Sequence, residues 1–303
     1  MFFFVKAIFF LAYTLIFIHG VFGGSSFIKI KFVFKKVGRS RTKFFGSVLM
    51  TIIKSAALAA LTILLPSIAF AAGGNLEPND PVGITFWLIS IAMVAATVFF
   101  LMESLRVSGK WRTSLIVGGL VTLVAAVHYF YMRDVWVSTG QSPTVFRYVD
   151  WLITVPLQMI EFYLILAACT AVAMGVFWRL LVGTVIMLLG GYLGEAGFIN
   201  ATLGFVIGMA GWAYILYEIF AGEAGKVAAD EAPESVKSAF SLMRWIVTIG
   251  WAIYPLGYFF GYLAGGVDDN SLNLIYNVAD VVNKIGFCLA IWAAATSESE
   301  AKA

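Results

Sequence analysis

Apolar segments long enough to cross a lipid bilayer recur along most of this sequence, and they constrain its fold more than any other feature. A membrane-spanning helix needs about 20 consecutive, mostly apolar residues. Seven segments after the polar patch at 75–80 meet that requirement: 84–105, 113–132, 144–168, 174–194, 199–220, 236–264 and 271–296. Short connections that are polar or rich in glycine separate them. The sequence therefore predicts an all-α membrane protein, folded as a seven-transmembrane-helix bundle.

The composition supports this class and excludes several others. The chain is 61% hydrophobic and 12% charged, whereas a soluble domain carries about twice that share of charge. The two cysteines, Cys169 and Cys288, lie in apolar segments, so neither a disulfide framework nor a metal site is indicated. The two histidines, His19 and His128, are too few for a His-rich metal centre. The net charge of +3 is small and does not indicate nucleic-acid binding.

Residues 50–71 have the features of a secretory signal peptide. A basic residue, Lys54, precedes an apolar region at 56–65, and an A-x-A cleavage site follows at 69–71. Cleavage there would release a seven-helix domain that comprises residues 72–303.

Signal peptides normally begin a chain, yet this pattern begins at Met50. We hypothesise that Met50 is the true start and that residues 1–49 are an upstream extension of the reading frame, outside the fold. Their bias toward Phe, Lys and Ile is what translated AT-rich non-coding DNA would give. The alternative is an additional membrane helix at 1–22 followed by a basic linker. A mature N-terminus near Ala72 would support the first hypothesis.

Basic residues in the connections predict the orientation of the bundle, because cytoplasmic loops carry an excess of Lys and Arg. One side of the predicted bundle has six: Arg106, Lys110, Arg112, Arg179, Lys226 and Lys237. The other side has Arg133 in the connection after the second segment, and only acidic residues at Asp268 and Asp269. The first side is therefore expected to be cytoplasmic, with the mature N-terminus outside and the C-terminus inside.

The third segment carries polar side chains that an ordinary membrane helix would lack. They stand at Arg147, Asp150, Thr154, Gln158 and Glu161. These spacings of three and four residues place all five on one face of a helix. Eleven residues correspond to about 16 Å of helix, so the two carboxyls are well separated, with the first nearer the outside. Ionisable groups inside a membrane are costly and usually functional.

The seventh segment contains a lysine about halfway along its length. Lys284 follows Asp280 by four residues, so the two share a helix face. Burial favours the neutral amine, which is how lysines become able to form Schiff bases. A protonated Schiff base needs a counterion, and Asp280 and Asp150 stand at suitable depths. A purely structural ion pair is the alternative, but Glu161 has no obvious partner and argues against it.

Five motifs carry a resemblance to a known family. They read HYFYMRDVW from 128, RYVDWLITVPLQMIEFYLIL from 147, YLGEAG from 192, GWAIYPLGYF from 250 and LNLIYNVADVVNKI from 272. In type and order they resemble the motifs of the proteorhodopsins, which are light-driven proton pumps among the microbial rhodopsins. The blue-absorbing type is the better match.

The resemblance implies a role for each charged residue of the two segments. Lys284 is similar to the lysine that binds all-trans retinal covalently as a Schiff base. Asp150 resembles the primary counterion and proton acceptor, and Asp280 resembles the second counterion. Arg147 matches the arginine that lies outward of these carboxylates. Glu161 resembles the proton donor on the cytoplasmic side.

Further positions match the family's supporting residues. Asp150, Thr154 and Glu161 form the D-T-E triplet of its proton pumps, which chloride and sodium pumps change at the first or last position. His128 resembles the histidine that hydrogen-bonds the acceptor aspartate. Gln158 matches the colour-tuning position, where Gln accompanies blue absorption and Leu accompanies green.

The resemblance also implies an aromatic pocket around retinal. Its walls correspond to Trp151, Trp251, Tyr254 and Pro255. Helical periodicity by itself would place these four side chains in an ordinary core.

The function that the resemblance implies is outward proton pumping driven by light, which is transport and not enzymatic catalysis. A photosensory rhodopsin with a slow photocycle is the alternative, although a sensor can dispense with the donor Glu161. A transporter without photochemistry would not need Lys284 to bind retinal. The expected setting is the bacterial inner membrane, with lipid and protons as partners. Rings of five or six copies are expected, with Trp87 and His128 at the contact between protomers.

Overall fold

In a computed structural model of the chain, residues 77–301 can be described. The chain divides into two units, Met1–Ala71 and Ala72–Ala303, and the described residues belong to the second. The hypotheses about 1–49 and 50–71 concern residues outside the described range.

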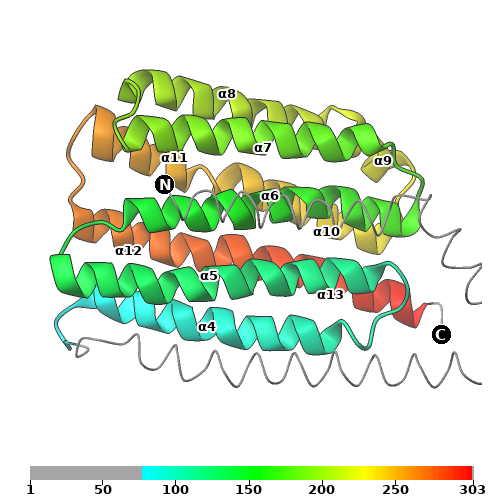
Figure 1. The fold of residues 1–303 in the computed structure, drawn as a ribbon. Coiled ribbons are helices and arrows are strands. Elements are labelled where there is room, and N and C mark those ends of the chain that lie inside the picture. Colours follow the sequence, from blue (N-terminus) through cyan, green and yellow to red (C-terminus); the bar gives the residue numbers. More distant parts are fainter. Residues whose placement is uncertain (1–76, 302–303) are drawn as a thin grey trace, which may run out of the picture. The chain divides into compact units, whose positions relative to one another are not determined.

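Seven helical segments long and apolar enough to cross a membrane occupy residues 77–301, so the predicted fold class is confirmed. The first five spans are single helices (Figure 1): α4 (Pro81–Glu103), α5 (Trp111–Thr139), α6 (Thr144–Cys169), α7 (Met174–Glu195) and α8 (Ala201–Phe220). The sixth span joins α10 (Glu234–Trp245), η1 (Ile246–Gly250), α11 (Ile253–Tyr258) and η2 (Phe259–Leu263). The seventh joins α12 (Asp269–Asp280), η3 (Val281–Gly286) and α13 (Phe287–Glu300).

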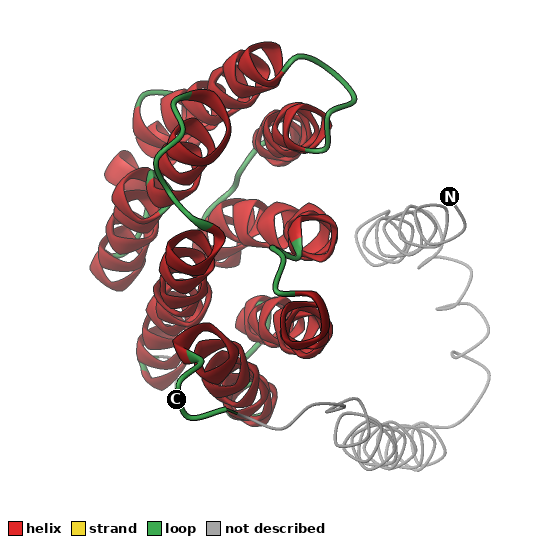
Figure 2. Cartoon of the chain, turned by 90° about the vertical axis from the view of Figure 1, so that its left-hand side faces the viewer, coloured by secondary structure: helices red, strands yellow, loops and turns green. Residues whose placement is uncertain are grey.

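The spans pack side by side in chain order, and the last returns to the first. Neighbouring pairs from α4 to α8 are in contact, and α12 contacts α4 while α13 contacts α10. Figure 2 looks along the bundle and shows these helices nearly end-on. Between α4 and α5 the core is fully buried, with Phe86, Met93, Ala125 and Tyr129 at its centre. This arrangement brings residues of the third and seventh spans face to face.

The second span is longer than the sequence predicted, and this corrects the position of Arg133. We expected a helix end at 132, but α5 continues to Thr139 and ends at Gly140, whose φ of 66° is left-handed. Arg133 therefore lies inside the helix and is 3% exposed, not in a connection. The extra turns are held by Trp136, whose indole N–H donates to the carboxylate of Asp80 at 3.1 Å. The connection 140–143 contains no basic residue, so the predicted charge asymmetry becomes sharper.

The connection between the fifth and sixth spans also differs from expectation, because it forms the short helix α9 (Glu223–Asp230) where a polar loop was predicted. Its apolar side is buried through Ala224 and Ala228. Arg179 of α7 fixes its start by an ion pair with Glu223 at 2.7 Å and a second with Glu218 at 2.8 Å. A tertiary ion-pair cluster thus supports a helix whose polar composition resembled a loop.

Two spans contain wider π-helical turns. The sixth has η1 and η2, and the seventh has η3, which contains Lys284. Such turns within α-helices are rare and often occur at functional sites, because they shift the side chains that follow and leave backbone carbonyls free. The π-helical turns lie at or next to Trp251, Pro255 and Lys284 in the sequence.

Candidate functional site

The amino group of Lys284 lies between two carboxylates in the centre of the bundle. Its Nζ is 2.6 Å from Oδ2 of Asp150 and 2.9 Å from Oδ2 of Asp280. The lysine is 2% exposed and both aspartates are fully buried. Buried charges are tolerated only when they are paired. This geometry is consistent with the sequence prediction that the three groups lie together.

The two carboxylates have different surroundings. Asp280 accepts hydrogen bonds from the phenols of Tyr129, at 2.8 Å, and Tyr254, in addition to the lysine. Among the described residues, only the lysine binds the Asp150 carboxylate, and Oδ1 of Asp150 has no hydrogen-bond partner there. Thr154 donates to the backbone carbonyl of Asp150 at 3.0 Å and not to its carboxylate. One aspartate is thus firmly held, while the other has free acceptor capacity.

Arg147 lies three residues before Asp150 on α6 and is oriented by two amides. Its Nη2 donates to Asn273 at 2.7 Å and to Asn277 at 3.2 Å, both on α12. Its guanidinium stacks over the ring of Tyr276, 5.2 Å from the centroid. Asn273 and Asn277 precede Asp280 on α12, so the guanidinium lies on the side of the carboxylates toward the start of α12. With Lys284 it balances the two negative charges.

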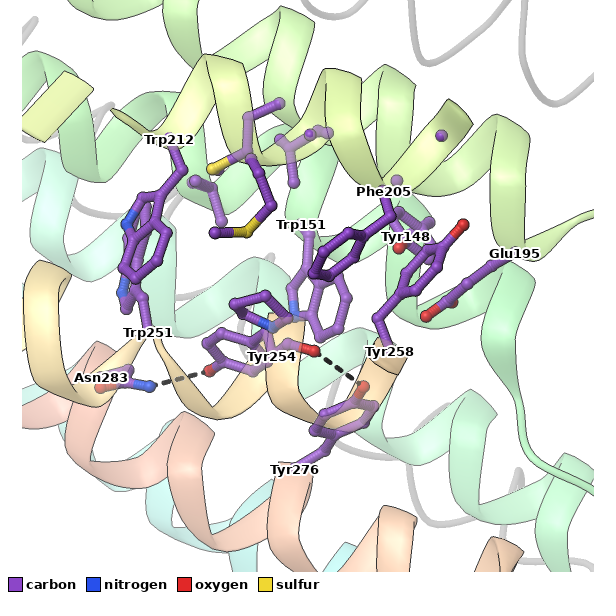
Figure 3. Close-up of a pocket in the computed structure, with 18 of the residues that line it drawn as sticks. Tyr148, Trp151, Glu195, Phe205, Trp212, Trp251, Tyr254, Tyr258, Tyr276 and Asn283 are labelled. Carbon is purple, nitrogen blue, oxygen red and sulfur yellow. Dashed lines mark hydrogen bonds between the residues drawn. The ribbon is translucent and has the colours of Figure 1, made fainter. Parts of the chain in front are cut away.

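A cavity of about 100 Å³, partly open to the surroundings, leads away from Lys284 between the third, fourth, fifth and sixth spans. Figure 3 shows Trp212 and Trp251 at one end, Trp151 in the middle, and Glu195 near Tyr258 at the other end. The four side chains predicted as pocket walls all line it: Trp151, Trp251, Tyr254 and Pro255. Eight aromatic side chains stand among the residues that line the cavity, and the buried Lys284 lines it as well.

Gln158 lines the same cavity and is held in a fixed orientation. Its Nε2 donates to the backbone carbonyl of Asn283 at 2.6 Å. Asn283 immediately precedes Lys284, so the amide lies beside the lysine. This carbonyl belongs to the π-helical turn η3, and it receives its hydrogen bond from Gln158 of α6.

Glu161 stands apart from the other charges of α6. It is 1% exposed, and neither carboxyl oxygen has a hydrogen-bond partner among the described residues. Its eleven-residue distance from Asp150 corresponds to about 16 Å along the helix. Proline in the helix interior, at Pro156, lies between the two. The sequence prediction of an unpaired carboxyl here agrees with this environment.

His128 does not make the hydrogen bond that we predicted. Its Nδ1 is 2.9 Å from the backbone carbonyl of Val124, four residues earlier in α5. No hydrogen bond joins it to Asp150, whose Oδ1 has no partner. Nδ1 is thus paired within α5, and a role for the other ring nitrogen, Nε2, stays a prediction.

Sequence reasoning missed several residues that complete the site. Tyr129 binds Asp280 from α5, and Asn283 contacts both Gln158 and Tyr254. The positions Asn273, Asn277, Asp280 and Lys284 are spaced four, three and four residues apart, so the polar face of the seventh span could have been found in the same way as that of the third. Tyr129 gave no such signal, because aromatic residues are common on apolar helix faces.

A comparison with known families shows which family the chain resembles. A family model described as bacteriorhodopsin-like protein matches residues 80–298. The chain belongs to this family. Two curated relatives are proteorhodopsins: a blue-light absorbing one from Gamma-proteobacterium Hot 75m4, 57% identical over 78% of this chain and 94% of the relative, and a green-light absorbing one from Gamma-proteobacterium EBAC31A08, 56% identical over 78% and 95%. The resemblance to proteorhodopsins is confirmed, and the protein is a multi-pass membrane protein.

Solved structures agree with this assignment. The crystal structure of blue light-absorbing proteorhodopsin from Med12 is 52% identical, with a TM-score of 0.63 over 72% of this chain and 100% of that chain. Exiguobacterium sibiricum rhodopsin is 36% identical, with a TM-score of 0.65 over 73% and 98%. Because blue-absorbing and green-absorbing relatives are almost equally similar, overall identity does not determine colour.

Proposed function

We propose that this chain is a light-driven pump that moves protons out of the cell, with all-trans retinal bound covalently to Lys284. The observation that carries the proposal is a buried amine, bonded to two carboxylates, at the end of an aromatic cavity. A structural neighbour, xanthorhodopsin, is a light-driven ion pump; it is 25% identical, with a TM-score of 0.64 over 75% of this chain and 97% of that chain.

The residues around Lys284 fit retinal. The apolar polyene would lie along Trp151, Trp251, Tyr254 and Pro255, which line the cavity together with the lysine. When bound, retinal supplies a Schiff-base linkage at Nζ of Lys284 and an isomerisation, driven by light, that moves this nitrogen. The remaining tasks, holding and moving protons, fall to the side chains of the protein.

Asp150 is suited to accept the proton held at Nζ of Lys284. The two groups are 2.6 Å apart, and the carboxylate has no other hydrogen-bond partner within residues 77–301, so neutralising it breaks a single contact there. Asp280 is bound by two phenols, which stabilise its charged form. We assign Asp150 as acceptor and Asp280 as the second counterion, which follows the general pattern of two carboxyls held in different environments. Thr154 binds the backbone carbonyl of Asp150. Arg147 supplies positive charge on the outward side of the same helix.

Glu161 is suited to return a proton to Nζ of Lys284 from the other side. A carboxyl that is fully buried without a cation favours its neutral form, so it holds a proton to give. It lies toward the end of α6 where Lys110 binds the carbonyl of Ala167 at 2.7 Å. Basic connections mark this end as cytoplasmic. Acceptor outside and donor inside give outward transport across a bacterial inner membrane, with the N-terminus outside and the C-terminus cytoplasmic.

Gln158 supports the proposal that the pigment absorbs blue light. Its amide is fixed beside Lys284 by the hydrogen bond to the carbonyl of Asn283. A fixed dipole there favours the ground-state charge distribution, in which positive charge stays at the nitrogen, and so widens the gap to the excited state.

We also propose that five or six copies form a ring through α4 and α5. Trp87 and His128 are partly buried on these helices, and Trp87 packs edge-on against Phe130 with ring centroids 5.7 Å apart. The mass of the complex extracted in mild detergent tests this; a monomer at all protein concentrations would contradict it.

The function is tested in cell membranes that contain the apoprotein. Addition of all-trans retinal should give a coloured pigment, and light should then acidify the medium until a protonophore is added. Lys284→Ala should stay colourless. Asp150→Asn should form pigment but should not acidify the medium. Glu161→Gln should form pigment of unchanged colour and recover slowly after a flash.

Each failure has a distinct meaning. A wild-type protein that stays colourless excludes retinal binding and favours a transporter without photochemistry. A coloured protein that releases no protons excludes the pump and favours a photosensor.

A further inference from the structure

Asn283, the residue directly before Lys284, joins the lysine-bearing turn to the sixth span. Its Nδ2 donates to the backbone carbonyl of Gly250 at 3.0 Å and to the phenol oxygen of Tyr254 at 3.0 Å (Figure 3 shows the second bond). An amide nitrogen carries two hydrogens, so both bonds form at once. The residue is 2% exposed, and water therefore does not compete for these bonds.

The approach of Asn283 to the sixth span requires glycine at 250. A Cβ placed there would overlap the amide oxygen of Asn283. Gly250 ends the π-helical turn η1, and a second side chain supports this turn, because Trp212 of α8 donates to the carbonyl of Val247 at 3.1 Å. Two side chains from other spans thus bind the same widened turn, but only Asn283 also reaches Tyr254.

The bond to Tyr254 extends the influence of Asn283 to the counterions. The phenol donates to Oδ1 of Asp280, and Oδ2 of that carboxylate lies 2.9 Å from Nζ of Lys284. A hydrogen bond received by a hydroxyl oxygen polarises the O–H group and strengthens the bond it donates. Asn283 should therefore increase the share of the negative charge that the phenol stabilises, and decrease the share that faces the lysine.

We propose that Asn283 is a positioning residue for the light-driven reaction, which sets, through Tyr254, how Asp280 distributes its charge opposite Lys284. The inference rests on the proposed binding of retinal at Lys284. It concerns a residue that touches neither proton-transferring carboxyl directly.

The titratable and charged groups around Asp280 come from several spans. They are Arg147 and Asp150 on α6, Tyr129 on α5, Tyr254 on α11, Tyr276 on α12 and Lys284 on η3. Removal of the Asn283 amide leaves all of them in place; it removes the bond to Tyr254 together with the bond to the carbonyl of Gly250.

The experiment uses the retinal-loaded protein and two spectroscopic readouts, the absorption maximum and the midpoint of the acid-induced colour change. Asn283→Leu removes the amide and keeps the volume, and Tyr254→Phe removes the phenol. Both should move the maximum to shorter wavelength, since more negative charge then faces the lysine. Both should raise the midpoint, by a few tenths of a pH unit for Asn283→Leu, because the carboxylate is less stabilised. The double variant should shift hardly more than Tyr254→Phe alone, since residues that act through one bond are not additive.

Trp212→Phe supplies the matched control, because it removes the other bond to η1 without contacting Tyr254. Its shift, whatever its size, should add to that of Tyr254→Phe. Additive shifts of Asn283→Leu and Tyr254→Phe, or an unchanged spectrum and midpoint in Asn283→Leu, would overturn the inference. If Asn283→Leu yields no pigment, Asn283→Ala completes the same cycle. Absence of pigment in the wild type would instead contradict the proposed function.

Discussion

The two carboxylates that flank Lys284 should contribute very differently to stability, although they look equivalent in sequence. Asp280→Ala removes an acceptor that binds Tyr129, Tyr254 and the lysine. Asp150→Ala removes an acceptor that binds the lysine alone. After the second change the lysine keeps a partner and no phenol is stranded. After the first, two phenols lose their acceptor, and Tyr129 is fully buried.

The expected difference follows from the number of bonds. A hydrogen bond to a charged group contributes about 1.5–3 kcal/mol. Asp280 makes three such bonds and Asp150 makes one, so Asp280→Ala should lower the free energy of unfolding by roughly 3–6 kcal/mol more than Asp150→Ala.

The assay is reversible unfolding of the apoprotein in mixed micelles, followed by far-ultraviolet circular dichroism. Tyr129→Phe serves as the matched control, because it removes one of the three bonds and keeps the ring; it should cost about one bond's contribution. Equal losses for the two alanine variants, or a larger loss for Asp150→Ala, would refute the view that the phenols anchor Asp280.

Three further outcomes are expected. Gln158→Leu should move the absorption maximum of the pigment to longer wavelength, because the amide dipole is lost; an unmoved maximum would remove Gln158 from the colour-tuning role. Asp80→Ala should lower the free energy of unfolding by about 1–2 kcal/mol, since it removes the cap of α4 and the bond to Trp136; thermal unfolding of the pigment measures it, and an unchanged midpoint would contradict it. The bonds from the backbone N–H and hydroxyl of Ser271 lower the pKa of the exposed Asp268 carboxyl. These two hydrogen bonds should therefore stabilise the start of α12 fully above the ordinary carboxyl pKa of about 3.9, and the stabilisation should be lost as pH falls through the lowered pKa. Hydrogen exchange at the Ser271 amide would detect this loss. An exchange rate that does not depend on pH, after correction for the intrinsic rate, would contradict the prediction.

Local periodicity made much of this site predictable. Arg147, Asp150 and Glu161 fall on one face of α6 because helical geometry alone sets their phase. The pair of Asp280 and Lys284 follows from the same rule. The seven spans followed from apolar length, and the largest errors arose where tertiary contacts extended or created a helix, at Trp136 and in α9.

What the sequence by itself determined was therefore the set of helices and the polar face of each one, since both depend on neighbours within a few residues. Only the tertiary structure decided which faces meet. Asp150 and Lys284 are 134 positions apart, and their contact depends on how two helices are rotated and at what depth they pack. The same packing gives Asp280 two phenols and leaves Asp150 with none, and it brings Asn283 against Gly250. Two aspartates that look alike in sequence acquire different hydrogen-bond partners, because their neighbours come from other spans.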